Sequence, residues 1–155
     1  MDKHHTAHYN SEIGTIEIVG TGEGIVSLGF VDEPDRDAPD YHQCLEPCLD
    51  QLDEYFQGKR RVFNLSLFLQ GTSFQKKVWK ALLDIPYGTT QSYADIARKI
   101  DNPNAFRAVG NANNKNNIAI IIPCHRVIGS DGHLIGYASG LWRKVWLLAH
   151  ESSNL

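Results

Sequence analysis

A cysteine, a histidine and an arginine stand side by side at Cys124, His125 and Arg126, directly after the apolar run 118–122 and Pro123. A cysteine attacks as its thiolate, and at an ordinary pKa of about 8.5 only a few per cent of it is ionised at neutral pH. Cationic neighbours or a histidine base increase that fraction. The triplet therefore predicts a nucleophilic cysteine, although a cysteine behind so apolar a run also fits simple core packing.

A histidine works as a base when a second group orients it. Neighbours on an extended chain point to opposite faces, so we expect His125 to act on Cys124 through a bridging water or through a turn at Pro123. Glu151, at the end of the last predicted helix, could fold back and supply the orienting carboxylate. For Arg126 we expect a structural role, tying the two halves of the chain together through the acidic front half.

Other thiol chemistries lack the residues that they need. The phosphatase pattern requires arginine at position 130, where Ser130 stands, and a redox pair requires cysteine at 127, where Val127 stands. A catalytic zinc site requires more ligands near Cys124 than His125 alone. A thiol hydrolase built from Cys124, His125 and Glu151 stays open.

A second set of possible metal ligands lies in the front half. Cys44 and Cys48 are four residues apart on a predicted helix and could join His42, or a terminal histidine cluster, around a metal. That cluster consists of His4, His5 and His8. We favour the simpler interpretation of ordinary helix cysteines and a mobile histidine-rich terminus, with no metal site.

The composition is that of a packed protein of one ordinary domain or two small ones, with 155 residues, 42% hydrophobic and 21% charged. The longest apolar run is too short to cross a bilayer, and the start MDKHHTAHYN lacks the apolar stretch of a signal peptide. Three cysteines, an odd number, do not form a disulfide framework. We expect a soluble intracellular protein.

The net charge of −3 is unevenly distributed. Residues 1–69 hold 5 Lys/Arg and 13 Asp/Glu, whereas residues 70–155 hold 10 and 5. This asymmetry predicts that only the back half meets an anionic partner, although it also fits solubility alone.

The front half has the pattern of a scaffold. Two β-rich runs, 14–19 and 24–31, flank a turn and predict a hairpin. Apolar residues at helical spacing from Leu45 to Phe56 predict a helix that ends near Gly58. The alternating segment 62–68 predicts a further strand that completes a small antiparallel sheet.

The back half has the pattern of a helical unit that begins near residue 70. Ser73 is a candidate N-cap for a helix that Pro86 stops, and Ser92 caps a second helix through residue 100. A tight turn and a helix over 104–114 follow, which together predict a helix-turn-helix, although many helical corners look alike. Small residues leave the last helix narrow enough to approach a groove closely: Ala105, Ala108, Gly110 and Ala112.

Three segments carry a specific resemblance: SFQKKVWKALLDIPYGTTQSYADIA, NPNAFRAVGNANNKNN and IPCHRVIGSDGHLIGYASGLWRKVWLLAHE. Together they closely resemble the O6-alkylguanine-DNA alkyltransferases over about 70–151, while the front half is similar in length and in strand-strand-helix-strand order. The resemblance implies an α+β fold. It comprises a small N-terminal ribonuclease H-like sheet with a helix (1–69) and a mostly helical, winged-helix-like C-terminal domain with the helix-turn-helix (70–155).

The resemblance also implies direct reversal of DNA damage. The protein would rotate O6-alkylguanine out of DNA and move the alkyl group onto its own Cys124, once per molecule and without a cofactor. His125 matches the water-linked base and Glu151 its orienting carboxylate. Asn116 matches an asparagine that braces the turn between the recognition helix and the active-site strand, here the run 118–122.

The remaining matches concern the DNA and the base. Tyr93 matches a tyrosine that rotates the target phosphate, and Arg107 an arginine that fills the vacated stack. Val127 would offer its carbonyl to the exocyclic amine of guanine. The recognition helix contributes Ala105, Ala108, Gly110 and Asn111, and the pocket wall Gly136, Tyr137, Ala138, Ser139 and Gly140. Ala138 stands where some relatives carry a serine hydroxyl that faces the lesion oxygen.

The expected partner is double-stranded DNA that contains O6-alkylguanine, which a monomer binds through the minor groove. O4-alkylthymine in DNA is a second candidate substrate. We expect a cytoplasmic protein, associated with the nucleoid in a bacterium or nuclear in a eukaryote. Alkyltransferase-like proteins keep the fold, lack the cysteine and bind lesions without repair. Cys124 argues against that group here.

Overall fold

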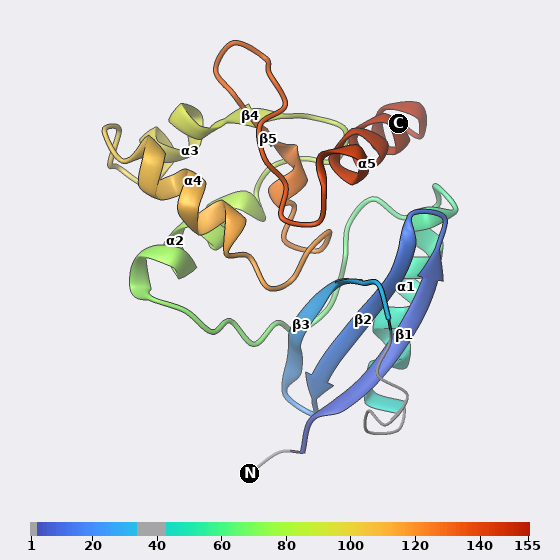
Figure 1. The fold of residues 1–155 in the computed structure, drawn as a ribbon. Coiled ribbons are helices and arrows are strands. Elements are labelled where there is room, and N and C mark those ends of the chain that lie inside the picture. The colour runs from blue at the N-terminus through green and yellow to red at the C-terminus, as the bar shows by residue number, and fades with distance from the viewer. Residues whose placement is uncertain (1–2, 34–42) are drawn as a thin grey trace. The chain divides into compact units, whose positions relative to one another are not determined.

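The computed structural model describes residues 3–33 and 43–155, and the chain divides into two compact units, Met1–Leu69 and Gln70–Leu155. The first is a small sheet with one helix and the second is mostly helical, so the predicted α+β class is confirmed (Figure 1).

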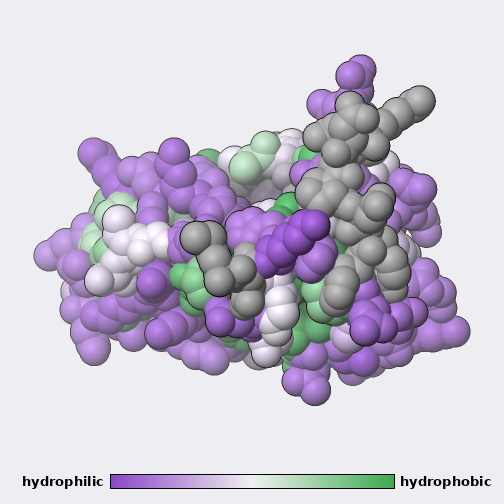
Figure 2. Space-filling view, turned by 90° about the horizontal axis from the view of Figure 1, so that it is seen from below, coloured by the Kyte–Doolittle hydropathy of each residue, from purple (hydrophilic) through white to green (hydrophobic). Residues whose placement is uncertain are grey.

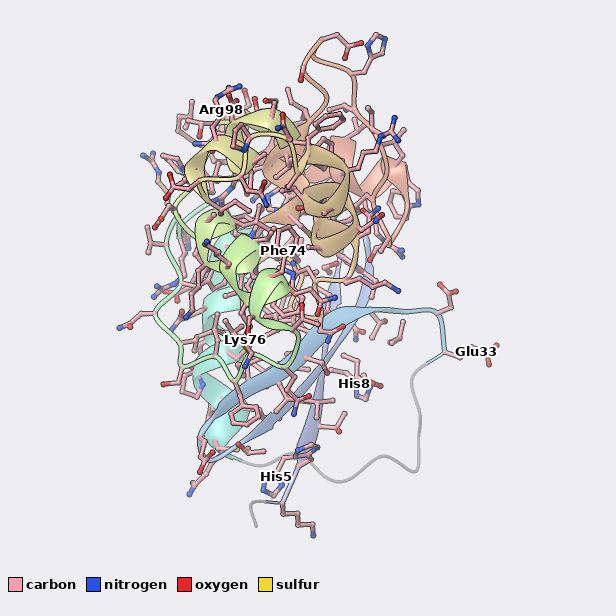
Figure 3. The ribbon with its side chains drawn as sticks, turned by 90° about the vertical axis from the view of Figure 1, so that its left-hand side faces the viewer. His5, His8, Glu33, Phe74, Lys76 and Arg98 are labelled. Atoms are coloured by element: carbon pink, nitrogen blue, oxygen red, sulfur yellow. The ribbon has the colours of Figure 1, made fainter. Side chains whose placement is uncertain are left out.

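The sheet of the first unit has the antiparallel order β1-β2-β3. Its strands are β1 (His5–Ser11), β2 (Gly14–Thr21) and β3 (Gly24–Val31), and the predicted hairpin is β2-β3. Ile16 and Ile18 are fully buried at alternate positions of β2, as a sheet with one covered face requires. The expectation of a mobile histidine-rich terminus is wrong, because His5 and His8 belong to β1 (Figure 3), and His8 pairs with Glu17 at 3.1 Å.

A single helix completes the core of this unit. After the 3-10 turn η1 (Gln43–Leu45), α1 (Glu46–Phe56) buries Leu52 and Tyr55, and Gly58 ends it at φ 76°. Cys48 is buried and Cys44 is half-buried, while His42 lies outside the described residues. Over 3–33 and 43–155, no group of three or more His, Cys, Asp or Glu side chains could hold a metal ion.

The strand predicted over 62–68 is wrong. This segment makes one bridge, parallel rather than antiparallel, between Leu67 and Ile25. Within this described segment, only Ser66 and Phe68 bond the backbone of Ile25, at 2.9 and 2.8 Å. Earlier in the segment, the side-chain amide of Gln51 bonds both the N–H and the carbonyl of Asn64, at 2.8 and 3.0 Å. The segment thus crosses the sheet edge without joining it as a strand.

The second unit is built from four helices and short connecting elements (Figure 1). The helix α2 (Ser73–Leu82) begins one residue earlier than predicted, because Thr72 and not Ser73 is its N-cap, in a capping box with Gln75. The predicted Ser92 cap is present and forms a capping box with Asp95. In Figure 3, Phe74 and Lys76 lie on α2 and Arg98 on α3. The remaining elements are β4 (Gln91–Ser92), α3 (Tyr93–Lys99), α4 (Phe106–Asn114), η2 (Cys124–Arg126), β5 (Val127–Ile128) and α5 (Leu141–Ser153).

The helices α3 and α4 form the predicted helix-turn-helix, with Asp101 in the left-handed region at φ 59° in the turn. Val109 is fully buried on the inner face of α4. Trp79 of α2 fixes this helix by donating its indole N–H to the carbonyl of Ala112 at 2.9 Å. Ala112 is 2% exposed, so of the four small residues it lies on the packed side of α4.

The isoleucine run 118–122 is buried throughout, but it is not the strand that we expected. Ile120 has φ 70°, which bends the chain, and the N–H of Ile122 bonds the carbonyl of Ile118 at 3.1 Å. The run is therefore a compact turn that carries Cys124 into η2. Among the described residues, no helix is long and apolar enough to cross a membrane, and one face is shown in Figure 2 as largely hydrophilic.

Candidate active site

Cys124 opens the 3-10 turn η2 and is 6% exposed. Its backbone N–H bonds the carbonyl of Ile122 at 2.7 Å. Asn116 holds the same segment from both sides: its amide donates to the Ile122 carbonyl at 2.8 Å, and its side-chain oxygen accepts from the N–H of Ile118 at 2.9 Å. Asn116 thus braces the segment that presents the thiol. This segment is a turn, where we expected a strand.

A buried cluster of three ionisable side chains follows directly. Glu151 of α5 lies 2.7 Å from His125 Nε2 through its Oε2, and accepts from Arg126 Nε at 2.8 Å and Nη2 at 3.0 Å. The N–H of Gly88 also donates to Glu151 Oε1 at 3.2 Å. The His125 and Glu151 side chains are 0% exposed. The fold thus brings Glu151 of α5 onto His125, a contact that sequence spacing alone could not establish.

Arg126 is the cation of this cluster. Besides Glu151, its guanidinium donates to the carbonyl of Ile85 at 2.7 Å and lies over the ring of Tyr87, 5.7 Å from the centroid. All of these partners belong to the C-terminal unit. These contacts give Arg126 the role of a counter-charge to Glu151 within the C-terminal unit.

The charges assign the histidine tautomer. Burial alone would raise the pKa of Glu151, but the hydrogen bonds and charges of His125 and Arg126 hold it well below its usual range. The ionised carboxylate can only accept, so His125 Nε2 carries the hydrogen and Nδ1 is an acceptor. Burial lowers the pKa of His125, which keeps the ring neutral. Its Nδ1 is buried and has no hydrogen-bond partner among the residues that the structure describes.

Burial raises the pKa of the Cys124 thiol, while a hydrogen bond from Asn116 and the charge of Lys144 act in the opposite direction. A resting thiol is therefore protonated at neutral pH. Ionising it requires a base, and His125 Nδ1 is a neutral acceptor within the same turn.

Lys144 is a site residue that the sequence analysis missed. It is fully buried, and its Nζ donates to the carbonyls of Val127 at 2.6 Å, Ile135 at 2.9 Å and Gly136 at 3.3 Å. Burial lowers its pKa to about 8. The available signal was its spacing, because Lys144 and Glu151 are seven residues apart and share one face of α5.

The loop after β5 contains the predicted pocket wall. Gly136 and Gly140 have φ 50° and 103°, and the Gly140 N–H bonds the Tyr137 carbonyl at 2.8 Å. Burial raises the pKa of Tyr137 well above its usual value, and within the described chain its buried hydroxyl has no hydrogen-bond partner. Ser139 offers its carbonyl to Arg143 at 2.8 Å, and Ala138 is exposed.

The outer face of α4 contains most of the predicted DNA contacts. Arg107, Ala108 and Asn111 are exposed, and Ala105 is the half-buried N-cap residue. Gly110 faces Tyr93, because a Cβ added there would lie 3.8 Å from the tyrosine ring.

Two further features complete this face. The Tyr93 hydroxyl donates to the carbonyl of Ile135 at 3.3 Å, so Tyr93 joins α4 to the loop after β5. Phe106, which the sequence analysis left out, is 49% exposed at the first position of α4.

Comparisons with known proteins cover both units. Residues 5–69 match the family described as 6-O-methylguanine DNA methyltransferase, ribonuclease-like domain, and residues 73–153 match its DNA binding domain. A methylated-DNA–protein-cysteine methyltransferase of Methanosarcina barkeri is 51% identical over 94% of this chain and 95% of its own length. That of Mycobacterium leprae is 48% identical over 97% and 94%.

Solved structures agree. The Mycobacterium tuberculosis O6-methylguanine methyltransferase has a TM-score of 0.90 and 43% identity, covering 99% of this chain and 95% of its own. The M. tuberculosis OGT in complex with DNA has a TM-score of 0.90 and 45% identity, covering 97% and 94%. The chain belongs to the 6-O-methylguanine DNA methyltransferase family.

Proposed function

We propose that this protein repairs alkylated DNA by direct reversal, transferring the alkyl group of O6-alkylguanine to Cys124 once per molecule. The proposal is carried by one observation: the buried thiol is followed in the same turn by a histidine that a buried carboxylate orients, with its second ring nitrogen unpaired. The names and sequence similarity of the relatives support it.

The first step is ionisation of the thiol. Glu151 holds the Nε2–H of His125, so Nδ1 takes a proton from a bridging water, which takes the proton of Cys124. The imidazolium formed is stabilised by the neighbouring carboxylate of Glu151. Asn116 and Lys144 stabilise the thiolate, since both lower the pKa of Cys124.

The second step is the transfer itself. The sulfur attacks the alkyl carbon, an S–C bond forms, and the bond from that carbon to O6 breaks. The electron pair stays on the base, which takes up the proton held by His125 and becomes ordinary guanine. The thioether has no good leaving group, so the protein is used up, and the reaction needs no cofactor.

DNA binding is assigned to α4 in the minor groove. A base inside the duplex cannot reach Cys124, so it must rotate out at a cost of a few kcal/mol. Inserted side chains offset that cost in minor-groove proteins. Arg107, exposed on α4, fills the vacated stack, and the exposed ring of Phe106 beside it suits the apolar wedge that such proteins use. Tyr93 stands next to this face and turns the target phosphate.

The rotated base would lie against the loop after β5. The Val127 carbonyl accepts from its exocyclic amine, since a carbonyl has two lone pairs and Lys144 occupies one. Tyr137 and the segment from Gly136 to Gly140 form the wall. The protein acts as a monomer. In a bacterium it is cytoplasmic and associated with the nucleoid, and in a eukaryote it is nuclear.

Intact-mass spectrometry with an O6-methylguanine oligonucleotide tests this function. We expect the intact mass to rise by about one methyl group, peptide mapping to place that group on the peptide that holds Cys124, and Cys124→Ala to show no gain. An unmodified protein that still binds the lesion would instead indicate a lesion-binding protein. Release of many ester or amide products per molecule would indicate a thiol hydrolase.

A further inference from the structure

The segment 85–88, between α2 and β4, has no role in the mechanism above, although it contacts both members of the buried ion pair. The Ile85 carbonyl accepts from Arg126 Nη1 at 2.7 Å, and the same guanidinium lies over the Tyr87 ring, 5.7 Å from the centroid. Gly88 donates its backbone N–H to Glu151 Oε1 at 3.2 Å. One short segment thus holds the cation and the carboxylate together.

The Gly88 N–H bonds the carboxylate oxygen opposite to the one that His125 contacts. His125 Nε2 lies 2.7 Å from Glu151 Oε2, whereas Gly88 bonds Oε1. Arg126 bonds both oxygens, but it is the neighbour of His125 in η2, while Gly88 is a donor from a separate segment. The carboxylate therefore cannot turn away from His125 without breaking the bond to Gly88 as well.

This bond depends on a backbone conformation that glycine adopts easily. Gly88 has φ 77°, in the left-handed region, where a residue with a Cβ is strained. A Cβ at this position would also lie 2.3 Å from Leu155 Cδ2, at the far end of an exposed side chain. The leucine can move aside, but the backbone requirement stays.

We propose that Gly88 is a positioning residue for thiol ionisation, whose N–H fixes the Glu151 carboxylate so that His125 keeps its hydrogen on Nε2. His125 Nδ1 then remains the acceptor for the proton of Cys124. This inference rests on the function proposed above. Ile85 and Tyr87 hold Arg126 in the same way.

The test moves the N–H without changing a reacting group. Valine is rarely left-handed, so Gly88→Val should turn the N–H away from Glu151. Asparagine tolerates this backbone, so Gly88→Asn should keep the bond. Both changes are made together with Leu155→Ala, which opens the space that a side chain needs. Leu155→Ala alone is the reference, since Leu155 is 68% exposed.

Single-turnover transfer is measured with saturating O6-methylguanine duplex. The valine variant should be about tenfold slower than the reference, the loss expected for one hydrogen bond to a charged group, and the asparagine variant within about threefold of it. In a Glu151→Gln background, the valine change should cost less than about twofold, because the carboxylate that Gly88 positions is absent. Gly58→Val, at φ 76° after α1, is the control for backbone strain and should keep the wild-type rate.

The tautomer of His125 gives a second readout that needs no DNA. In nitrogen NMR spectra, the reference should carry the hydrogen on Nε2, and the valine variant should show both tautomers. If the valine variant does not fold, Gly88→Ala replaces it in each comparison.

Equal transfer by the valine and asparagine variants, or a valine loss that adds fully to that of Glu151→Gln, would overturn the positioning role. An unchanged tautomer in the valine variant would overturn it too. No transfer to the wild type would instead overturn the proposed function, while the tautomer still tests the role of Gly88.

Discussion

Replacing Glu151 with glutamine tests the buried cluster most directly. Glu151 accepts hydrogen bonds from His125, from two nitrogens of Arg126 and from the N–H of Gly88. Glutamine keeps the shape, but it removes the charge and turns an NH2 group toward donors. The Arg126 side chain, 7% exposed, then lacks its counter-charge.

General magnitudes for buried ion pairs and for base catalysis set the size of both effects. Removing one partner of a buried ion pair costs 3–5 kcal/mol, and Arg126 keeps its bond to the Ile85 carbonyl, so the free energy of unfolding should fall by about 3 kcal/mol. His125 loses the group that fixes its tautomer and stabilises its charged form. General base catalysis contributes 10²–10⁴-fold, so transfer should slow by about 100-fold.

Urea unfolding measures the first effect, and single-turnover transfer below the unfolding transition measures the second. Glu54→Gln is the control, since Glu54 pairs with Arg60 at 3.1 Å on the surface, where a salt bridge contributes less than about 1 kcal/mol. If Glu151 and His125 form one relay, His125→Phe combined with Glu151→Gln should be no slower than His125→Phe alone. Additive losses would refute the relay and leave Glu151 a purely structural charge.

Three further predictions follow. Cys124→Ala should abolish transfer yet bind lesion DNA nearly as well as the wild type in a mobility-shift assay; transfer in this variant, onto Cys44 or Cys48, would contradict the assignment. Arg107→Ala should repair duplex DNA slowly even at saturating DNA but react almost normally with free O6-benzylguanine, whereas full recovery at saturation would make Arg107 a phosphate contact. Because burial lowers the pKa of His125, its neutral form persists as pH falls, so the transfer rate at pH 6 should stay close to that at pH 7.5; a tenfold fall per pH unit from neutrality would indicate unassisted attack by the thiolate.

The elements that the sequence predicted correctly are those whose pattern is local. The hairpin β2-β3, the helix α1 and the Ser92 cap follow from alternation, helical spacing and capping chemistry within a few residues. The strand β1 was not predicted, and two segments with strand-like composition are not strands. In 62–68 a side chain from α1 bonds the backbone, and in 118–122 a left-handed residue bends the chain. Neither the contact of Gln51 with Asn64 nor the positive φ of Ile120 can be predicted from hydrophobicity.

The residues of the candidate site likewise divide into those that the sequence predicted and those that it did not. Cys124 and His125 stand out because of their chemistry, and Glu151 because a histidine base requires an orienting acceptor. Lys144 and Asn113 were missed, because a polar residue within a helix normally faces solvent. Their burial depends on carbonyls that other segments supply: those of Val127, Ile135 and Gly136 for Lys144, and that of Cys124 for Asn113.

Burial of the thiol has two opposing consequences, and the structure balances them. It raises the pKa of Cys124, which keeps the resting thiol protonated and protects a residue that can react only once. It also removes competing water, so the oriented His125 and the buried ammonium of Lys144 act at full strength in a medium of low dielectric constant. The thiolate therefore has to form only for the transfer itself, with His125 as the proton acceptor. A site for one irreversible transfer is better served by a protected thiol with a nearby base than by a permanently ionised one.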